Sequence, residues 1–137
     1  MKKDIVIDNK IEQIALLAPF VEEICEDLGL GPEFVFNLNL VLEEAVTNVV
    51  MYAYPEGETH QIWLSAEDHN GNLIFTLQDE GEEFDPTLAP EADVTLSAEE
   101  RELGGLGIFL IRQIMNEVSY QRIDGRNVLT MKKNTDV

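Results

Sequence analysis

Basic side chains are scarce in this sequence. Its 137 residues contain 9 Lys and Arg against 27 Asp and Glu, so the formal net charge at pH 7 is −18. Proteins hold nucleic acids and anionic membrane surfaces with clusters of Lys and Arg. We therefore expect no nucleic acid and no membrane as a partner. A phosphate group bound to this chain would need a metal ion or backbone N–H groups to offset its charge.

Cysteine, histidine and long apolar runs are also in short supply. The single cysteine, Cys25, excludes an internal disulfide and a cysteine-rich zinc site. The two histidines, His60 and His69, lie in or near predicted turns without a spaced set of partners. No apolar run approaches the roughly 18 residues of a membrane span, and the first ten residues lack the apolar stretch of a signal peptide. We expect a cytoplasmic protein.

Apolar periodicity predicts a single α+β domain over residues 1–137. Helices are expected at about residues 11–28, 32–54 and 105–115. Strands are expected at residues 4–8, 62–65, 73–77, 118–123 and 127–132. Pro19 predicts a kink or a late start in the first helix, and Cys25 lies on that helix's apolar stripe, where a buried side chain is expected. Tight turns between neighbouring strands predict a mainly antiparallel mixed sheet with helices on one face, a two-layer α/β sandwich.

Residues 80–103 break the pattern of short connections. This stretch is acidic, carries Pro86 and Pro90, and has a short helix signal at residues 97–102. A connection of this length inside a compact domain is usually functional. The sequence predicts a lid over a binding site.

Two polar residues in the second predicted helix could carry chemistry. Glu44 and Asn48 are four residues apart, so their side chains project from one helix face. A carboxylate can accept a proton or orient a water molecule, and an amide oxygen can bind a hard cation such as Mg²⁺. Read alone, the pair would more often be an exposed polar stripe.

Two glycine-bearing loops follow that helix. The first reads Asp79-Glu80-Gly81 and the second Gly104-Gly105-Leu106-Gly107, which opens the third predicted helix. A glycine run at a helix start can present backbone N–H groups to phosphates. Alone, the first loop would be a turn after a strand, and the second a flexible hinge. Together with Glu44 and Asn48, they supply the parts of an ATP site.

These motifs resemble those of the GHKL ATPases. Glu44-Ala-Val-Thr-Asn48 is similar to the N box of that superfamily, and the two loops are similar to its first and second glycine boxes. Three boxes in the family order resemble most closely the bacterial anti-sigma-factor serine/threonine kinases. The resemblance covers residues 5–132 and implies the Bergerat-type ATP-binding fold.

The resemblance also implies roles for individual residues. Glu44 would be the general base and Asn48 a ligand of Mg²⁺. Asp79 would accept a hydrogen bond from the adenine amino group, and Gly81 would let the backbone approach the base. The remaining residues implied to contact ATP are Gly105 and Gly107 at the phosphates, Thr130 at the adenine, and Arg101 at the phosphates.

The family's partners and its rivals complete the expectation. An anti-anti-sigma protein of the STAS type would be phosphorylated on serine, a sigma factor would be sequestered, and the chain would form a homodimer. One departure concerns Arg101, which lies between Glu100 and Glu102, carboxylates that could pair with it instead. The alternatives are a nucleotide-binding switch module with little or no phosphotransfer, and the catalytic half of a histidine kinase.

Overall fold

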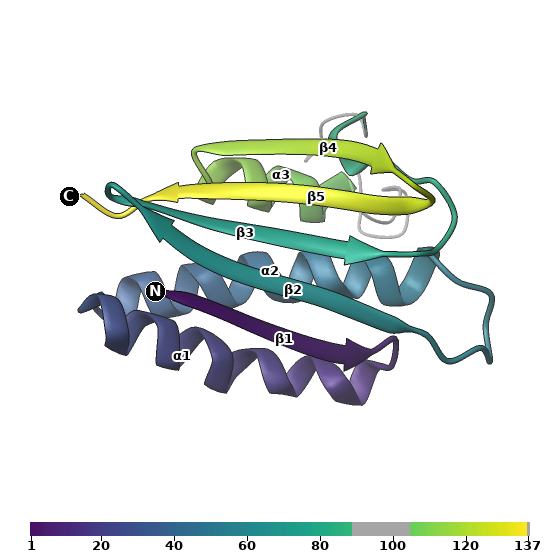
Figure 1. The fold of residues 1–137 in the computed structure, drawn as a ribbon, viewed down its shortest axis with the longest axis horizontal. Helices are drawn as coiled ribbons and strands as arrows, with labels where there is room; N and C mark the ends of the chain where they lie inside the picture. The colour runs from purple at the N-terminus through teal and green to yellow at the C-terminus, as the bar shows by residue number, and fades with distance from the viewer. Residues whose placement is uncertain (89–104, 137) are drawn as a thin grey trace.

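One antiparallel sheet organises the molecule. The computed structural model describes residues 1–88 and 105–136. The strands are β1 (Lys2–Asp8), β2 (Gln61–His69), β3 (Asn72–Asp79), β4 (Glu117–Ile123) and β5 (Arg126–Asn134). They form one five-stranded sheet in the order β1-β2-β3-β5-β4 (Figure 1). All four pairings are antiparallel, so the described sheet has no parallel pair.

Two tight turns fix the register of the sheet. Asn70-Gly71 joins β2 to β3, and Asp124-Gly125 joins β4 to β5. All four residues have positive φ, at 48° and 82° in the first turn and 49° and 77° in the second. Positive φ at both central positions matches the twist of antiparallel strands and favours Asn-Gly and Asp-Gly. Both turns lie where the sequence predicts them.

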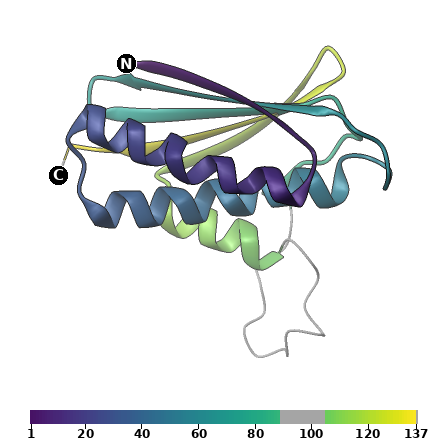
Figure 2. The ribbon, with the colours of Figure 1, turned by 90° about the horizontal axis from the view of Figure 1, so that it is seen from below.

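Three α-helices cover one face of the sheet (Figure 2). They are α1 (Leu17–Leu28), α2 (Pro32–Tyr52) and α3 (Gly105–Ile114), and a 3₁₀ turn, η1 (Ile11–Leu16), precedes α1. Pro19 falls in the first turn of α1, which confirms the late helix start. Helix α2 ends two residues before the predicted Tyr54, because Pro55 disfavours the helical conformation in the residue before it.

The core lies between the sheet and α2. Helix α2 packs against both α1 and α3, and it buries Leu38, Val41, Leu42, Ala45 and Val46. It is the one described helix that is long and apolar enough, by length and composition, to cross a membrane. These five buried residues belong to one core with the helix-facing side of the sheet, where Phe75 is the largest fully buried side chain. Cys25 is buried as predicted. The two-layer α+β sandwich is confirmed.

Candidate functional site

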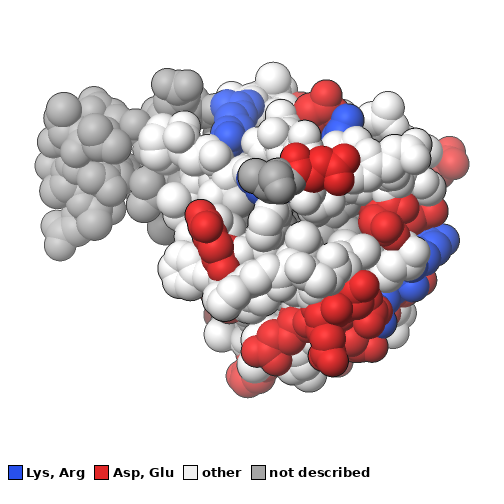
Figure 3. Space-filling model, turned by 90° about the vertical axis from the view of Figure 1, so that its left-hand side faces the viewer, with Lys and Arg blue, Asp and Glu red and all other residues white. Residues whose placement is uncertain are grey.

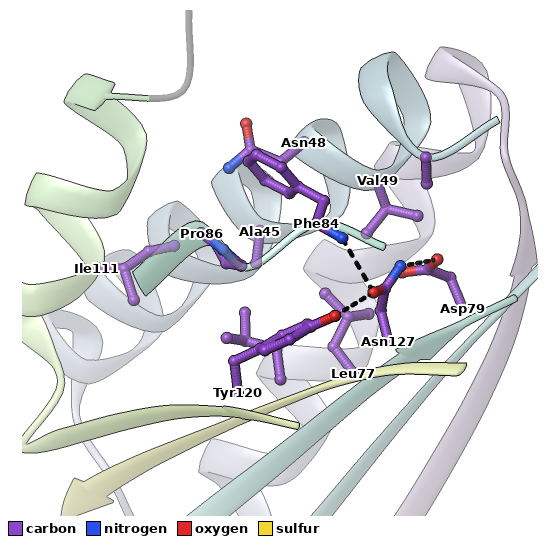
Figure 4. A pocket seen from close by; sticks show the side chains of 12 residues that line it. Ala45, Asn48, Val49, Leu77, Asp79, Phe84, Pro86, Ile111, Tyr120 and Asn127 are labelled. Atoms are coloured by element: carbon purple, nitrogen blue, oxygen red, sulfur yellow. Dashed lines mark hydrogen bonds between the residues drawn. The ribbon is translucent and has the colours of Figure 1, made fainter. Parts of the chain in front are cut away.

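A small cavity opens between the C-terminal half of α2 and the ends of β3 and β5 (Figure 4). Its volume is about 30 Å³, which is room for water but not for an organic ligand. The residues that line it come from both layers: Ala45, Asn48, Val49, Ala53, Leu77, Asp79, Phe84, Pro86, Ile111, Tyr120, Asn127 and Leu129. Asn48 projects from α2 beside the Phe84 ring, on the side of the cavity away from the sheet. A larger ligand would have to displace Phe84 and Pro86.

Asp79 is a buried carboxyl group at the end of β3. It continues the helix-facing series Leu73, Phe75 and Leu77 and is only 3% exposed. Burial raises the pKa of this carboxyl group, while hydrogen bonds from Asn127 and Gly81 and the charge of Arg122 act in the opposite direction. A raised folded pKa means that the ionised form destabilises the fold. The folded chain therefore loses stability as the pH rises from the ordinary pKa of 3.8 through the raised pKa of the folded state.

Asn127 holds the Asp79 carboxylate in place. Its Nδ2 donates to Asp79 Oδ1 at 2.9 Å and to the Glu82 carbonyl at 2.8 Å. Its Oδ1 accepts from the Tyr120 hydroxyl at 2.5 Å and from the Phe84 N–H at 3.2 Å. A fully bonded amide of this kind fixes both the carboxylate and the chain that follows β3.

Gly81 is required by packing against the end of α2. Its N–H donates to Asp79 Oδ1 at 2.9 Å, and the next residue, Glu82, donates its N–H to the Ala53 carbonyl at 2.8 Å. A Cβ at position 81 would lie 2.3 Å from the Ala53 carbonyl oxygen and 2.7 Å from the Ala53 Cβ. The close approach to the end of α2 therefore explains why a glycine is needed at position 81, which the sequence alone did not show.

We expect Gly81→Ala to lower the free energy of unfolding by about 1–3 kcal/mol, because the added methyl group overlaps backbone atoms that cannot move alone. Urea unfolding followed by circular dichroism would measure the change. Gly31→Ala is the control for an added methyl group, because a Cβ there meets nothing within 4 Å. Gly31 is the N-cap of α2, where alanine is less favourable than glycine, so we expect a loss of less than about 1 kcal/mol. Equal losses in the two variants would contradict the packing argument.

Two arginines lie close to the cavity, and both contact backbone carbonyls. Arg122 donates to the Gly81 carbonyl at 2.8 Å and to Asn127 Oδ1 at 3.1 Å. Arg112, in the last turn of α3, donates to the Thr87 carbonyl. These contacts tie β4 and α3 to the segment after β3, which runs through the short turn η2 (Pro86–Leu88).

The predicted base and metal ligand occupy successive turns of α2. Asn48 lines the cavity, whereas Glu44 lies one turn closer to the N-terminus and is not among the lining residues. Glu44 is half-buried and its neighbour Glu43 is exposed. The structure thus brings Asn48 and Asp79 to one cavity, and Glu44 is outside the set of residues that line it.

The second glycine motif lies at the start of α3. Gly105 is the first residue of that helix and Gly107 the third. Both lie in the first turn, where the backbone N–H groups of an α-helix have no intrahelical partners. Arg101, Gly104, the helix predicted at residues 97–102 and most of the predicted lid lie outside the described residues. The described part of that lid, residues 80–88, packs on the cavity through Phe84 and Pro86.

Thr130 is not brought to the cavity. Along β5, Asn127, Leu129 and Met131 are buried on the helix side, and Thr130 alternates with them. Successive strand residues point to opposite faces, so Thr130 faces away from Asp79. The predicted adenine contact at Thr130 is wrong on this geometry, and Asn127 occupies the place beside Asp79.

Sequence reasoning missed Asn127, Tyr120 and Phe84. A signal for Asn127 was present, because it shares a strand face with Leu129 and Met131, and a polar residue in such a series needs a polar partner. Tyr120 carried no comparable signal, since aromatic residues are ordinary in strands. Phe84 follows the first glycine loop as part of the motif that resembles the first glycine box, but no role in the site was predicted for it.

Comparison with known proteins finds that the sequence is similar to an ATPase domain family and to protein kinases. The model of the histidine kinase-like ATPase domain family matches residues 7–133. The chain is 34% identical over 96 residues to the serine/threonine-protein kinase BtrW of Bordetella bronchiseptica. That alignment covers 70% of this chain and 68% of BtrW. The chain is 29% identical over 134 residues to the serine-protein kinase RsbW of Halalkalibacterium halodurans, covering 95% of this chain and 81% of that protein.

A solved structure shares the fold. The RsbU and RsbW domains of a Mycobacterium tuberculosis protein superpose with a TM-score of 0.70 at 15% identity. The match covers 98% of this chain and 32% of that one.

Proposed function

This chain belongs to the histidine kinase-like ATPase family, and from that premise we propose that it is an ATP-dependent serine/threonine-protein kinase of the anti-sigma-factor type. The observation that carries the proposal is the buried Asp79 carboxylate at the cavity. Its described hydrogen bonds, from Gly81 and Asn127, both reach Oδ1. In the described part of the chain Oδ2 accepts none, which leaves it for the amino group of an adenine.

Adenine selection would rest on Asp79 and the groups that orient it. The Asn127 amide and the Gly81 N–H hold Oδ1, and they thereby fix the position from which Oδ2 would accept a donor. A buried acceptor left unpaired is unfavourable, so a base that offers a donor there is preferred over one that does not. Phe84 and Pro86 would move aside to admit the ring.

Mg²⁺ would be held mainly by the nucleotide. No cluster of three or more His, Cys, Asp or Glu side chains able to bind a metal occurs among residues 1–88 and 105–136. Asn48 can supply one oxygen ligand, and Mg²⁺ commonly takes one or two protein ligands with phosphate and water oxygens for the rest. When bound, Mg-ATP would supply the transferable phosphoryl group and the charge neutralisation that this acidic chain lacks.

The phosphates would lie toward the start of α3. The helix dipole and the free N–H groups near Gly105 and Gly107 favour an anion there. Glu44 is on the same face of α2 as Asn48, one turn away. From there its carboxylate would accept the proton of the attacking serine hydroxyl. Arg101 would be a further phosphate contact.

The proposed partners follow from the relatives. Two of them are named as serine or serine/threonine kinases, and the anti-sigma kinases that the motifs resemble act on a STAS-type anti-anti-sigma protein. We include sequestration of a sigma factor and formation of a homodimer in the proposal. A cytoplasmic location remains a prediction.

A nucleotide-binding switch with little phosphotransfer is the second candidate. The described arginines nearest the cavity, Arg112 and Arg122, are both engaged with backbone carbonyls. With a net charge of −18, the chain would then bind Mg-ATP through backbone groups but stabilise the transferring phosphoryl group weakly.

Transfer of labelled phosphate to a partner tests the proposal. The chain is incubated with Mg-ATP labelled at the γ-phosphate and the STAS-type protein encoded nearest its gene. We expect acid-stable label on a serine of that protein, lost when the serine is replaced by alanine or the Mg²⁺ is chelated. ATP binding in equilibrium dialysis without label on the partner would favour the switch. Acid-labile label on His60 or His69 of this chain would contradict both.

A further inference from the structure

A groove at the far end of the helical layer takes no part in the proposed nucleotide site. It is shallow and widely open to solvent, it lies where the C-terminal half of α1 faces the first turns of α2, and its volume is about 540 Å³. The residues that line it are Glu22, Cys25, Glu26, Leu30, Pro32, Val35, Phe36 and Asn39. Phe36 and Asn48 are separated along α2 by about 18 Å, at 1.5 Å per residue. This groove and the cavity at Asp79 are therefore separate features.

The floor and one wall of the groove are apolar. Leu30 and Val35 are half-buried and Cys25 is fully buried. Phe36 stands out from them with 68% of its surface exposed, the most exposed aromatic side chain among the described residues. An aromatic ring left in water beside a concave apolar surface is a common anchor point for a partner.

The opposite wall carries two carboxylates without a cation. Helix α1 has two acidic pairs with a four-residue spacing. Glu23 and Asp27 face β1, where Lys3 Nζ lies 2.7 Å and 3.0 Å from their oxygens. Glu22 and Glu26 line the groove, and neither has an ion pair with any residue in the described ranges. Like charges four apart on a helix repel each other, so this wall is arranged unfavourably for the isolated chain.

The surface of this end shows the same contrast. Figure 3 faces the end of the molecule where α1 meets α2, and acidic side chains gather in its lower part beside an uncharged area. A second copy of this chain brings 27 more acidic residues against 9 basic ones. Charge complementarity therefore favours a basic occupant over a second copy.

The groove also contains a polar side chain with an unpaired atom. Asn39 lines the groove, and its Oδ1 is buried without a hydrogen-bond partner among the described residues. Buried polar atoms are normally paired. Asn39 is therefore a polar side chain at the groove with unused hydrogen-bonding capacity.

We propose that this groove binds a basic amphipathic segment of another protein. Apolar side chains of the segment pack on Phe36, Leu30 and Val35, and its Lys or Arg side chains pair with Glu22 and Glu26. This is the helix-in-groove mode of recognition, in which apolar anchors give affinity and charges set orientation. The proposal does not depend on the assignment of the nucleotide site, because no residue of the groove lines the cavity at Asp79.

Binding of a model peptide to the full chain tests the groove. The probe is a fluorescein-labelled peptide of Leu and Lys whose leucines fall on one helical face, measured by fluorescence anisotropy at about 0.15 M salt. We expect Phe36→Ala to weaken binding about tenfold or more. The double variant Glu22→Gln/Glu26→Gln should weaken it about fivefold to tenfold through the two lost charge pairs.

The second acidic pair of α1 is the matched control. Glu23→Gln/Asp27→Asn removes the same charge from the same helix, on the face toward β1 about 100° around the axis. It should change the affinity by less than about twofold. Equal losses in the two double variants would reduce the effect to general attraction by an acidic chain and overturn the proposal. So would equal binding of a scrambled peptide. A smaller sedimentation coefficient for Phe36→Ala, measured without peptide, would also overturn it by assigning the groove to a second copy.

Discussion

Replacement of Asp79 by asparagine is expected to weaken ATP binding at least about 100-fold without loosening the fold. In the described structure, Oδ1 of Asp79 accepts from both Gly81 and Asn127, so it must stay an acceptor in the variant. The new amide nitrogen then takes the place of Oδ2 and points its own donor at the adenine amino group. Two facing donors, and the loss of a charged acceptor, together exceed the roughly 1.5–3 kcal/mol of a single charged hydrogen bond.

The stability of the fold should rise or stay unchanged in the Asp79→Asn variant. Burial raises the pKa of Asp79, so at neutral pH the ionised group is less favourable in the folded chain than in the unfolded chain. The neutral asparagine removes that disadvantage and keeps the acceptor for Gly81. A thermal melt followed by circular dichroism should give a Tm equal to or above that of the parent.

Glu80→Gln is the control for charge alone. Glu80 is exposed, and it lies 3.5 Å from Arg126 in a loose pair at the surface. Its replacement changes the net charge by the same amount as Asp79→Asn but should leave ATP affinity within about twofold. Isothermal titration with Mg-ATP compares the two variants. Unchanged affinity in Asp79→Asn would remove Asp79 from the adenine site.

Glu44→Gln is expected to lower the rate of phosphoryl transfer by about 10²–10⁴ while ATP still binds. A positioned general base contributes an effect of this size, and glutamine keeps the shape of the side chain but cannot take a proton. ATP affinity should stay within about threefold, because Glu44 is not among the residues that line the cavity. Label transferred per minute to the STAS-type partner, at saturating ATP, measures the rate.

Glu43→Gln separates the base from its neighbour. Adjacent helix residues are about 100° apart around the axis, and Glu43 is exposed whereas Glu44 is half-buried. The Glu43 variant should transfer phosphate at nearly the parent rate. If Glu44→Ala retained full kinase activity, the base would have to be another group.

Much of the fold could be predicted because it depends on local patterns. Asn-Gly and Asp-Gly turns specify tight hairpins through positive φ at two consecutive positions. The apolar repeat of α2 predicted a helix at the centre of the core, and Pro55 set its end more tightly than the repeat indicated. Strand alternation limited each strand to two possible faces, but in β5 it did not say that the face of Asn127 would lie beside Asp79.

The sequence by itself determined which motifs the candidate site contains. Only the tertiary structure decided which residues of those motifs, and which further residues, lie at the cavity. The order and spacing of the motifs at Glu44, Asp79 and Gly105 follow from the chain alone, since a helix face and a helix start are local features. The choice of Asn127 over Thr130 needed the sheet to pack against α2, because that packing selects which face of β5 meets Asp79. The need for glycine at position 81 likewise comes from its close contact with Ala53, which is distant in sequence and is brought near only by folding.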